Sequence, residues 1–319
     1  MLKTGLKVEK TGDLFRKFGL LFIIILMMAV MSIISPVFFT SGNLINVLRQ
    51  ISINGILAVG VTFVILTGGI DLSVGSMIAA SGVVAGSLLL DGHSPVVAIL
   101  AAMAIAVLFG TLNGVMIAFL GLPPFIATLA TQVGARGFSL VYSNGRPYAI
   151  TNEPFMEVGK GSSLGVPNPI WILLFVCVLA FCILKFTIYG RHVYAFGGNR
   201  NATKLAGVRT RLVECSVYML SGFLASIAAI ILAARISSGQ PTAGSGFELD
   251  AIAAVAIGGT SMAGGVGSIA GTVMGFCIIG IMNNSLTLLN VSSFYQQIVQ
   301  GLIIVIAVLI DIHAKKKSV

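Results

Sequence analysis

The sequence carries very little charge for its length. Charged residues make up 9% of its 319 residues, whereas apolar residues make up 57%. A typical soluble domain has about a quarter charged residues. The scarcity of charge therefore excludes a sizeable soluble domain, and the mean hydropathy of +1.04 indicates a chain that lies mostly within a bilayer.

Other absences exclude several kinds of catalytic or structural site. The four cysteines all fall in apolar stretches without a C-x-x-C spacing, which argues against a disulfide framework or a zinc site. The three histidines are scattered, so we expect no metal site. The phosphate-binding pattern G-x-x-x-x-G-K-[ST] is absent, because Lys160 is followed by glycine. We therefore expect no catalytic residue, no cofactor and no ATP hydrolysis in this chain itself.

The formal net charge of +9 is concentrated in three places. Fourteen of the nineteen Lys and Arg residues lie in residues 1–17, in the segment Lys185–Arg211 and at 315–317. Basic residues that flank membrane spans stay on the cytoplasmic side. We therefore expect the tail 1–17, the loop 189–211 and the tail 312–319 in the cytoplasm. Because these basic residues lie at the chain ends and in a loop between spans, they argue against nucleic-acid binding. We expect membrane lipid to surround most of the chain.

Apolar runs predict ten membrane spans, so the expected fold is an all-α polytopic membrane protein with a single domain, 1–319. Each run approaches the ~20 residues that cross a bilayer. An even number of spans puts both termini on one side, in agreement with the charge map. We expect the first run to stay as a span, because no signal cleavage site follows it. The spans are expected at about 18–36, 45–66, 70–90, 95–120, 124–142, 169–188, 212–234, 248–262, 265–289 and 295–311.

Two glycine-rich breaks interrupt the apolar pattern. Residues 67–73, TGGIDLS, separate two spans and contain a lone carboxylate, Asp71, whereas residues 258–265, GGTSMAGG, follow a short apolar run. Broken helices at membrane depth occur only where they line a cavity or lie buried in protein. Similar sequences accompany the two breaks, VGSMIA and VGSIA, which predicts two pseudo-repeated halves with short or broken helices around a central pathway.

Polar side chains inside the spans are candidates for a translocation path suited to hydroxyl-rich solutes. Two alternatives remain, because amides can instead bond helix to helix and Asp71 can act only as a cap for the helix that follows it. Arg136 also falls within a span and predicts an acidic or carbonyl partner. The candidate path residues are Asn54, Asp71, Ser73, Asn283, Asn284 and Gln296.

The loop 189–211 contains a predicted short helix. Asn199 or Asn201 can cap its start, Ala202–Ala206 form its turns, and Gly207 can end it. A short basic helix between membrane spans is suited to docking into a groove on another protein. The alternative is a charged loop that only fixes the topology.

The segment 235–250 is unusually polar for a connection between spans. It carries Gln240, Glu248 and Asp250 on the side opposite the basic loop. We therefore expect these three residues to form a docking surface for an external partner, with an ordinary solvated loop as the alternative.

Several motifs together resemble a known family of transport proteins. They are ILTGGIDLSVGS at 65–76, LGVP at 164–167, GGN at 197–199, QPTAG at 240–244, ELDAIAAV at 248–255 followed by GGTS, and VSSFYQ at 291–296. The chain resembles the membrane permease subunits of bacterial ATP-binding-cassette importers for monosaccharides. Within this branched-chain amino acid/ribose-type permease family, it resembles the ribose permeases most. The resemblance covers nearly the whole chain.

This resemblance implies a location, partners and a coupling segment. It implies a permease in the bacterial cytoplasmic membrane, paired with a second permease chain. A cytoplasmic ATPase subunit would bind ATP and magnesium, and an extracytoplasmic sugar-binding protein would deliver the sugar. A rival interpretation is a proton-coupled secondary sugar transporter with Asp71 as the proton site, and a scaffold or receptor fits the polar breaks poorly. The implied ATPase-coupling residues are Gly198, Asn199, Ala202, Thr203, Lys204, Leu205, Ala206 and Gly207.

Overall fold

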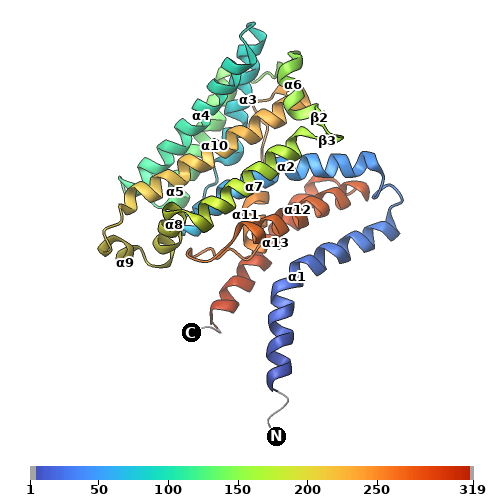
Figure 1. The fold of residues 1–319 in the computed structure, drawn as a ribbon. Helices are drawn as coiled ribbons and strands as arrows, with labels where there is room; N and C mark the ends of the chain where they lie inside the picture. Colours follow the sequence, from blue (N-terminus) through green and yellow to red (C-terminus); the bar gives the residue numbers. More distant parts are fainter. Residues whose placement is uncertain (1–4, 317–319) are drawn as a thin grey trace.

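The computed structural model describes the backbone of residues 5–316 and the side chains of residues 19–306 and 309. Long helices dominate it, and α2, α4, α7 and α10 run side by side (Figure 1). The helices are α1 (Gly5–Ile34), α2 (Ser41–Leu66), α3 (Val74–Leu90), α4 (Pro95–Ala118), α5 (Pro124–Tyr142), α6 (Glu153–Lys160), α7 (Asn168–Phe186), α8 (Ile188–Gly198), α9 (Arg200–Leu205), α10 (Thr210–Ile236), α11 (Phe247–Ile257), α12 (Ile269–Leu288) and α13 (Ser293–Lys316).

The all-α class is confirmed, and each expected span overlaps one helix. Five helices, α2, α4, α7, α10 and α12, are long and apolar enough to cross a membrane, and shorter apolar stretches lie at 19–34, 74–90 and 293–306. The count of ten spans and the pseudo-repeat therefore stay predictions. The predicted tail 1–17 is helical from Gly5 onward, as the first part of α1. Residues 1–4 and 317–319 of the two predicted tails lie outside the described residues.

Local sequence explains where helices begin. The hydroxyl of Ser94 accepts a hydrogen bond from the Val97 N–H, and Pro95 opens α4 at a position where no N–H is needed. Thr40 caps α2 in the same way, through the Asn43 N–H. Such caps satisfy backbone donors that the first helical turn leaves unpaired.

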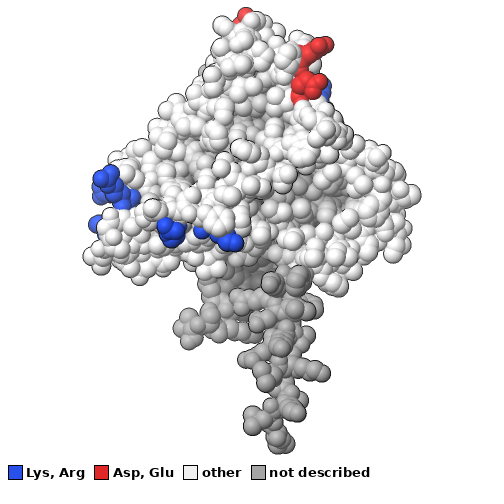
Figure 2. Space-filling model, in the orientation of Figure 1, with Lys and Arg blue, Asp and Glu red and all other residues white. Residues whose placement is uncertain are grey.

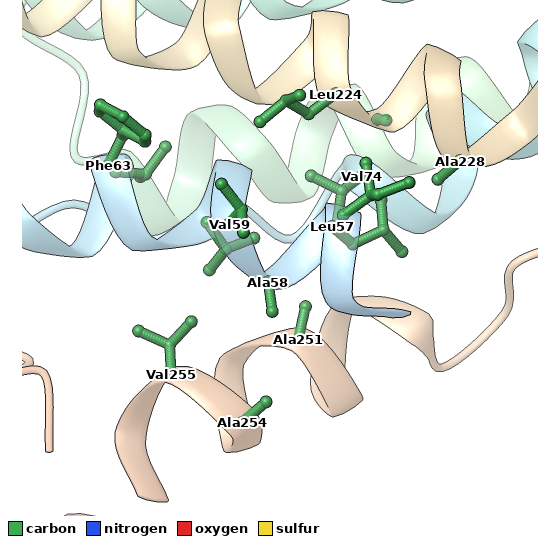
Figure 3. Packing of buried hydrophobic residues seen from close by; sticks show 14 of the residues in the cluster. Leu57, Ala58, Val59, Phe63, Val74, Leu224, Ala228, Ala251, Ala254 and Val255 are labelled. Carbon is green, nitrogen blue, oxygen red and sulfur yellow. The ribbon is translucent and has the colours of Figure 1, made fainter. Parts of the chain in front are cut away.

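The helix α2 forms the centre of the bundle. In its most apolar window 83% of the residues are buried, against 22% in α4 and in α7. Figure 3 shows Leu57 and Ala58 of α2 between Leu224 and Ala228 of α10 on one side and Ala251 of α11 on the other. Because lipid is as apolar as these side chains, close van der Waals packing rather than water exclusion favours this arrangement.

Glycines let α4 and α10 approach closely. Gly222 of α10 lies against the carbonyl of Ala106, and Gly110 of α4 lies against the carbonyl of Tyr218. A Cβ atom at either position would overlap that backbone. This crossing is therefore built on small residues, as membrane helix contacts commonly are.

Both predicted breaks are confirmed, and they touch. After α2 the chain turns at Gly68, with φ +77°, and stays non-helical until α3 begins at Val74. After the short α11, Gly259, Gly264 and Gly265 all have positive φ, a conformation that glycine adopts without strain. The Gly265 N–H donates to the Leu66 carbonyl at 2.9 Å, so the second break closes onto the end of α2.

Small helices and strands lie in the connections between the long helices. The connection 142–169 contains α6, the strand β1 (Tyr148–Ala149) and the hairpin of β2 (Ser162–Ser163) with β3 (Val166–Pro167). β1 pairs antiparallel with β4 (Ser238–Gly239), which ties this connection to the segment after α10. The sequence predicted one short helix in 189–211 and did not predict α8. The aromatic and glycine residues of α8 are also common in loops.

Charge separates the two ends of the bundle. In Figure 2, Lys and Arg gather along one edge near α8 and α9, and Asp and Glu gather at the far edge near α6 and the α3–α4 connection, where the exposed Lys160 of α6 also lies. We call these the basic end, with Arg191, Arg200, Lys204, Arg209 and Arg211, and the acidic end, with Asp91, Glu153 and Glu157.

Candidate functional site

The predicted short helix in the basic loop is confirmed as α9, which begins two residues before Ala202. Its N-cap is Asn199, whose side-chain oxygen accepts the Ala202 N–H at 2.9 Å. At its end Gly207 has φ +84° and donates to the Lys204 carbonyl at 3.0 Å. The next N–H reaches the Thr203 carbonyl at 3.3 Å, which completes the pair of bonds typical of a glycine-terminated helix.

Most of α9 is open to solvent. Leu205 is 90% exposed, an unusual position for a large apolar side chain in a charged loop. Thr203 alone among the candidate coupling residues is buried, and its hydroxyl bonds the Asn199 carbonyl. The exposed members of that set are Gly198, Asn199, Ala202, Lys204, Leu205, Ala206 and Gly207, with Gly198 as the last residue of α8.

The helix α8 attaches α9 to both breaks. Gly197 has no room for a Cβ, because the Leu66 carbonyl and the Gly265 N–H occupy that space. The hydroxyl of Tyr194 donates to the Gly267 carbonyl at 2.9 Å. Burial raises the pKa of the Tyr194 phenol, so it remains a donor at neutral pH. A displacement of α8 would therefore press on both glycine breaks.

A groove of about 680 Å³ opens beside α9 at the basic end. It is lined by the first break at 67–69, the α4–α5 connection, the α8–α9 junction and the start of α10. Arg200 and Glu214 meet at its edge in a two-pronged ion pair, with N–O distances of 2.6 and 3.2 Å. No other ion pair occurs among the described residues.

The carboxylate of Asp71 is fully buried and held by nearby donors. One oxygen accepts the Ser73 N–H at 3.0 Å and the Ser73 hydroxyl, and the other accepts the Ser221 hydroxyl at 2.8 Å. Asn113 then donates to the Ser73 hydroxyl at 2.8 Å. A negative group just before α3 also suits the positive end of that helix. This geometry favours a structural role for Asp71, which fixes Ser73 at the start of α3, although no side chain caps the first turn of that helix.

A second buried carboxylate, Asp250 in α11, gathers amides from three other helices. Asn54 of α2, Asn283 of α12 and Gln300 of α13 each donate to it, at 3.2, 3.3 and 2.5 Å. The side-chain oxygen of Asn54 is buried without a hydrogen-bond partner. A carboxylate with several amides offers the donors and acceptors that a polyhydroxy solute needs.

The other two amides that were predicted to line a path form hydrogen bonds within the protein. Asn284 exchanges hydrogen bonds with Asn43 at 2.8 and 3.1 Å, which joins α12 to the start of α2. Gln296 donates to the Val291 carbonyl at 2.9 Å within the start of α13. For these two residues the helix-bonding alternative describes the contacts.

The comparisons with known proteins agree with this architecture. Residues 43–308 match the family described as branched-chain amino acid transport system, permease component. The chain belongs to this permease family. It is similar to the ribose import permease protein of Escherichia coli K12, with 48% identity over 292 residues, 90% of this chain and 91% of the relative. No solved structure matched the chain.

Two further relatives extend the comparison. The ribose import permease protein of Bacillus subtilis strain 168 is 45% identical over 319 residues, which cover 99% of this chain and 98% of the relative. The L-arabinose transport system permease protein of Escherichia coli K12 is 36% identical over 305 residues, 96% of this chain and 93% of the relative. Like these permeases, the chain is a multi-pass membrane protein.

The predicted docking surface of this permease needs a correction. Glu248 and Asp250 are each 7% exposed, because α11 turns both carboxylates into the bundle, and only Gln240 of the three lies at the surface. Glu248 accepts the Gln132 amide at 3.0 Å. Arg136 donates to the carbonyls of Pro241 and Ala243, both at 2.8 Å, so its predicted partners are carbonyls.

Sequence reasoning missed three residues that complete these clusters. Glu214 carried a usable signal, since it is a lone acid at the start of an apolar span. Ser221 and Asn113 carried none, because small polar residues are common in membrane helices. Gln300 is among the amides of the last span that the sequence indicates as path-lining or helix-bonding, but its partner Asp250 lies fifty residues away in sequence.

Proposed function

We propose that this chain is the membrane permease subunit of an ATP-driven importer for a monosaccharide, with ribose as the substrate. The two relatives with the highest identities reported above are ribose import permeases, at 48% and 45% over nearly their whole lengths. The arabinose permease, at 36% identity, supports a monosaccharide as the substrate, but it does not support ribose in particular.

The observation that carries the proposal is the capped, solvent-exposed helix α9 beside two helix breaks. An importer needs a docking element that is joined to the path. Gly197, Tyr194 and the Arg200–Glu214 pair supply that junction. The exposed Leu205 would insert into a groove of the ATPase, as anchors of docked helices do.

In this proposal the basic end and both termini face the cytoplasm, in accordance with the positive-inside rule. The chain itself is non-catalytic, and the ATPase binds ATP and magnesium. The sugar-binding protein docks at the acidic end, where Gln240 remains a candidate contact. Two permease chains pair in the lipid of the cytoplasmic membrane, with the path along their shared interface.

We place one sugar contact of the path at the Asp250 cluster. Its carboxylate and the amides of Asn54, Asn283 and Gln300 come from four different helices, so a shift of α11 would open the cluster. Asp71 and Ser73 then serve to hold the start of α3. This assignment leaves the rival proton-coupled mechanism without a free carboxylate at the first break.

The test is uptake of labelled ribose into proteoliposomes that contain this chain, its ATPase and its binding protein. We expect uptake only with ATP inside and binding protein outside. Deletion of Ala202–Gly207 should abolish uptake and leave membrane insertion unchanged. Uptake driven by a proton gradient without ATP would contradict the proposal, and full uptake by the deletion variant would contradict the role of α9.

A further inference from the structure

The ion pair between α9 and α10 joins an exposed helix to a buried acid. Arg200 is the first residue of α9, and its side chain is about half exposed, whereas Glu214 is 6% exposed near the start of α10. Both guanidinium prongs reach the carboxylate, and the Arg200 guanidinium also lies 5.1 Å from the centre of the Phe196 ring. Bidentate pairs of this kind fix orientation as well as distance.

One face of α10 then leads from this ion pair to the first break. Glu214, Tyr218 and Ser221 are four and three residues apart, so they lie on the same side of the helix. Ser221 donates to Asp71 at 2.8 Å. The hydroxyl of Tyr218 fills the space where a Cβ of Gly69 would lie. A single rigid helix therefore contacts α9 at one point and residues 69–71 at two others.

The helices α8 and α9 contact the rest of the bundle in two ways, one through the backbone and one through charge. The contact of Gly197 with Leu66 and Gly265 is backbone against backbone, and it lies at the end of α2, next to the first break, and in the second break. The route through Arg200 and Glu214 reaches the first break and depends on charge. A groove of about 680 Å³, lined by residues 67–69 and by Asn199 and Arg200, lies between α9 and the first break.

We propose that the Arg200–Glu214 ion pair is the link that transmits movement of α9 to α10 and, through Tyr218 and Ser221, to the break that holds Asp71. This inference rests on the proposed function, since α9 moves only if an ATPase docks there. Arg200 and Glu214 are positioning residues, and neither contacts sugar or nucleotide. Loss of one partner leaves a buried charge unpaired, whereas exchange of the two charges restores the pair.

The experiment measures sugar transported per ATP hydrolysed in the reconstituted complex of permease, ATPase and binding protein. It compares the wild type with Arg200→Glu, with Glu214→Arg and with the double exchange. We expect each single reversal to lower this ratio about tenfold or more while the ATPase stays bound and active. The double exchange should restore the ratio to within about threefold of the wild type.

Arg191→Glu is the matched control, because Arg191 is an exposed arginine of the same loop with no ion pair among the described residues. It should leave the ratio unchanged. Three results would overturn the link: single reversals with a normal ratio, a double exchange no better than the worse single, or loss of the ATPase from the single variants alone. A wild-type complex that transports without ATP would instead contradict the proposed function.

Discussion

At the scale of the residue, two buried aspartates of this permease are held by neutral hydrogen-bond donors. Asp71 and Asp250 are both buried, and both accept three hydrogen bonds from neutral groups rather than from a cation. Asp71 takes two of its bonds from Ser73, two positions along the chain, so its position is fixed mainly by local sequence. Asp250 takes its bonds from three other helices, so its position depends on their packing.

The substitution Asp71→Asn tests whether Asp71 holds the start of α3 through Ser73 or carries protons. The asparagine oxygen still accepts the Ser73 N–H, and the Ser221 hydroxyl can rotate to accept from the amide. We expect sugar uptake within about threefold of the wild type. Asp71→Leu leaves those donors unpaired, at about 1–3 kcal/mol each, and should lower uptake at least tenfold. Complete loss of uptake in correctly inserted Asp71→Asn would instead favour the proton-coupled mechanism.

At the scale of the element, α10 has the widest set of tasks. It crosses α4 through Gly110 and Gly222, packs on α2, and carries Glu214, Tyr218 and Ser221 along one face. Its long buried surface makes it a rigid rod between the basic end and the core. The breaks beside it are the deformable parts, because their glycines adopt positive φ without strain.

Gly222→Ala should destabilise the bundle although alanine is the better helix former. Helix propensity favours the alanine by about 1 kcal/mol, but its Cβ would overlap the Ala106 carbonyl, and overpacking costs about 1–3 kcal/mol. We expect a lower midpoint of thermal unfolding in detergent. Gly301→Ala, whose Cβ would meet open space, is the control and should not lower the midpoint. A midpoint for Gly222→Ala at or above that of the control would refute the close crossing.

At the scale of the whole molecule, charge and hydropathy give the bundle a direction. The basic and acidic ends lie at opposite edges of the bundle (Figure 2). The membrane cannot hide either set of charges, so an orientation with the basic end inside is favoured. The hairpin tip at Leu164 and the helix α9 then lie on opposite sides of the bilayer.

Cysteine labelling measures this orientation. Leu164→Cys and Leu205→Cys, each in a chain without its four native cysteines, replace side chains that are 92% and 90% exposed. In intact cells a membrane-impermeant maleimide should label position 164 and not position 205, and permeabilised cells should label both. Equal labelling of the two positions in intact cells would contradict this orientation and the assignment of α7 as the span between them.

The sequence by itself determined the long helices of this permease, the two breaks and the short helix α9. Apolar runs located the helices, glycines located both breaks, and Asn199 with Gly207 bounded α9. These features depend on local propensity, backbone conformation and hydropathy, which neighbouring residues fix. The family also followed from local motifs such as TGGIDLS and ELDAIAAV.

Tertiary structure alone decided which polar residues meet. It turned Glu248 and Asp250 inward, brought Asn54, Asn283 and Gln300 to one carboxylate, and separated Asn284 from them by pairing it with Asn43. A buried polar group needs a partner, but which partner it finds depends on the rotation and depth of packed helices, and one turn of a helix is enough to change it.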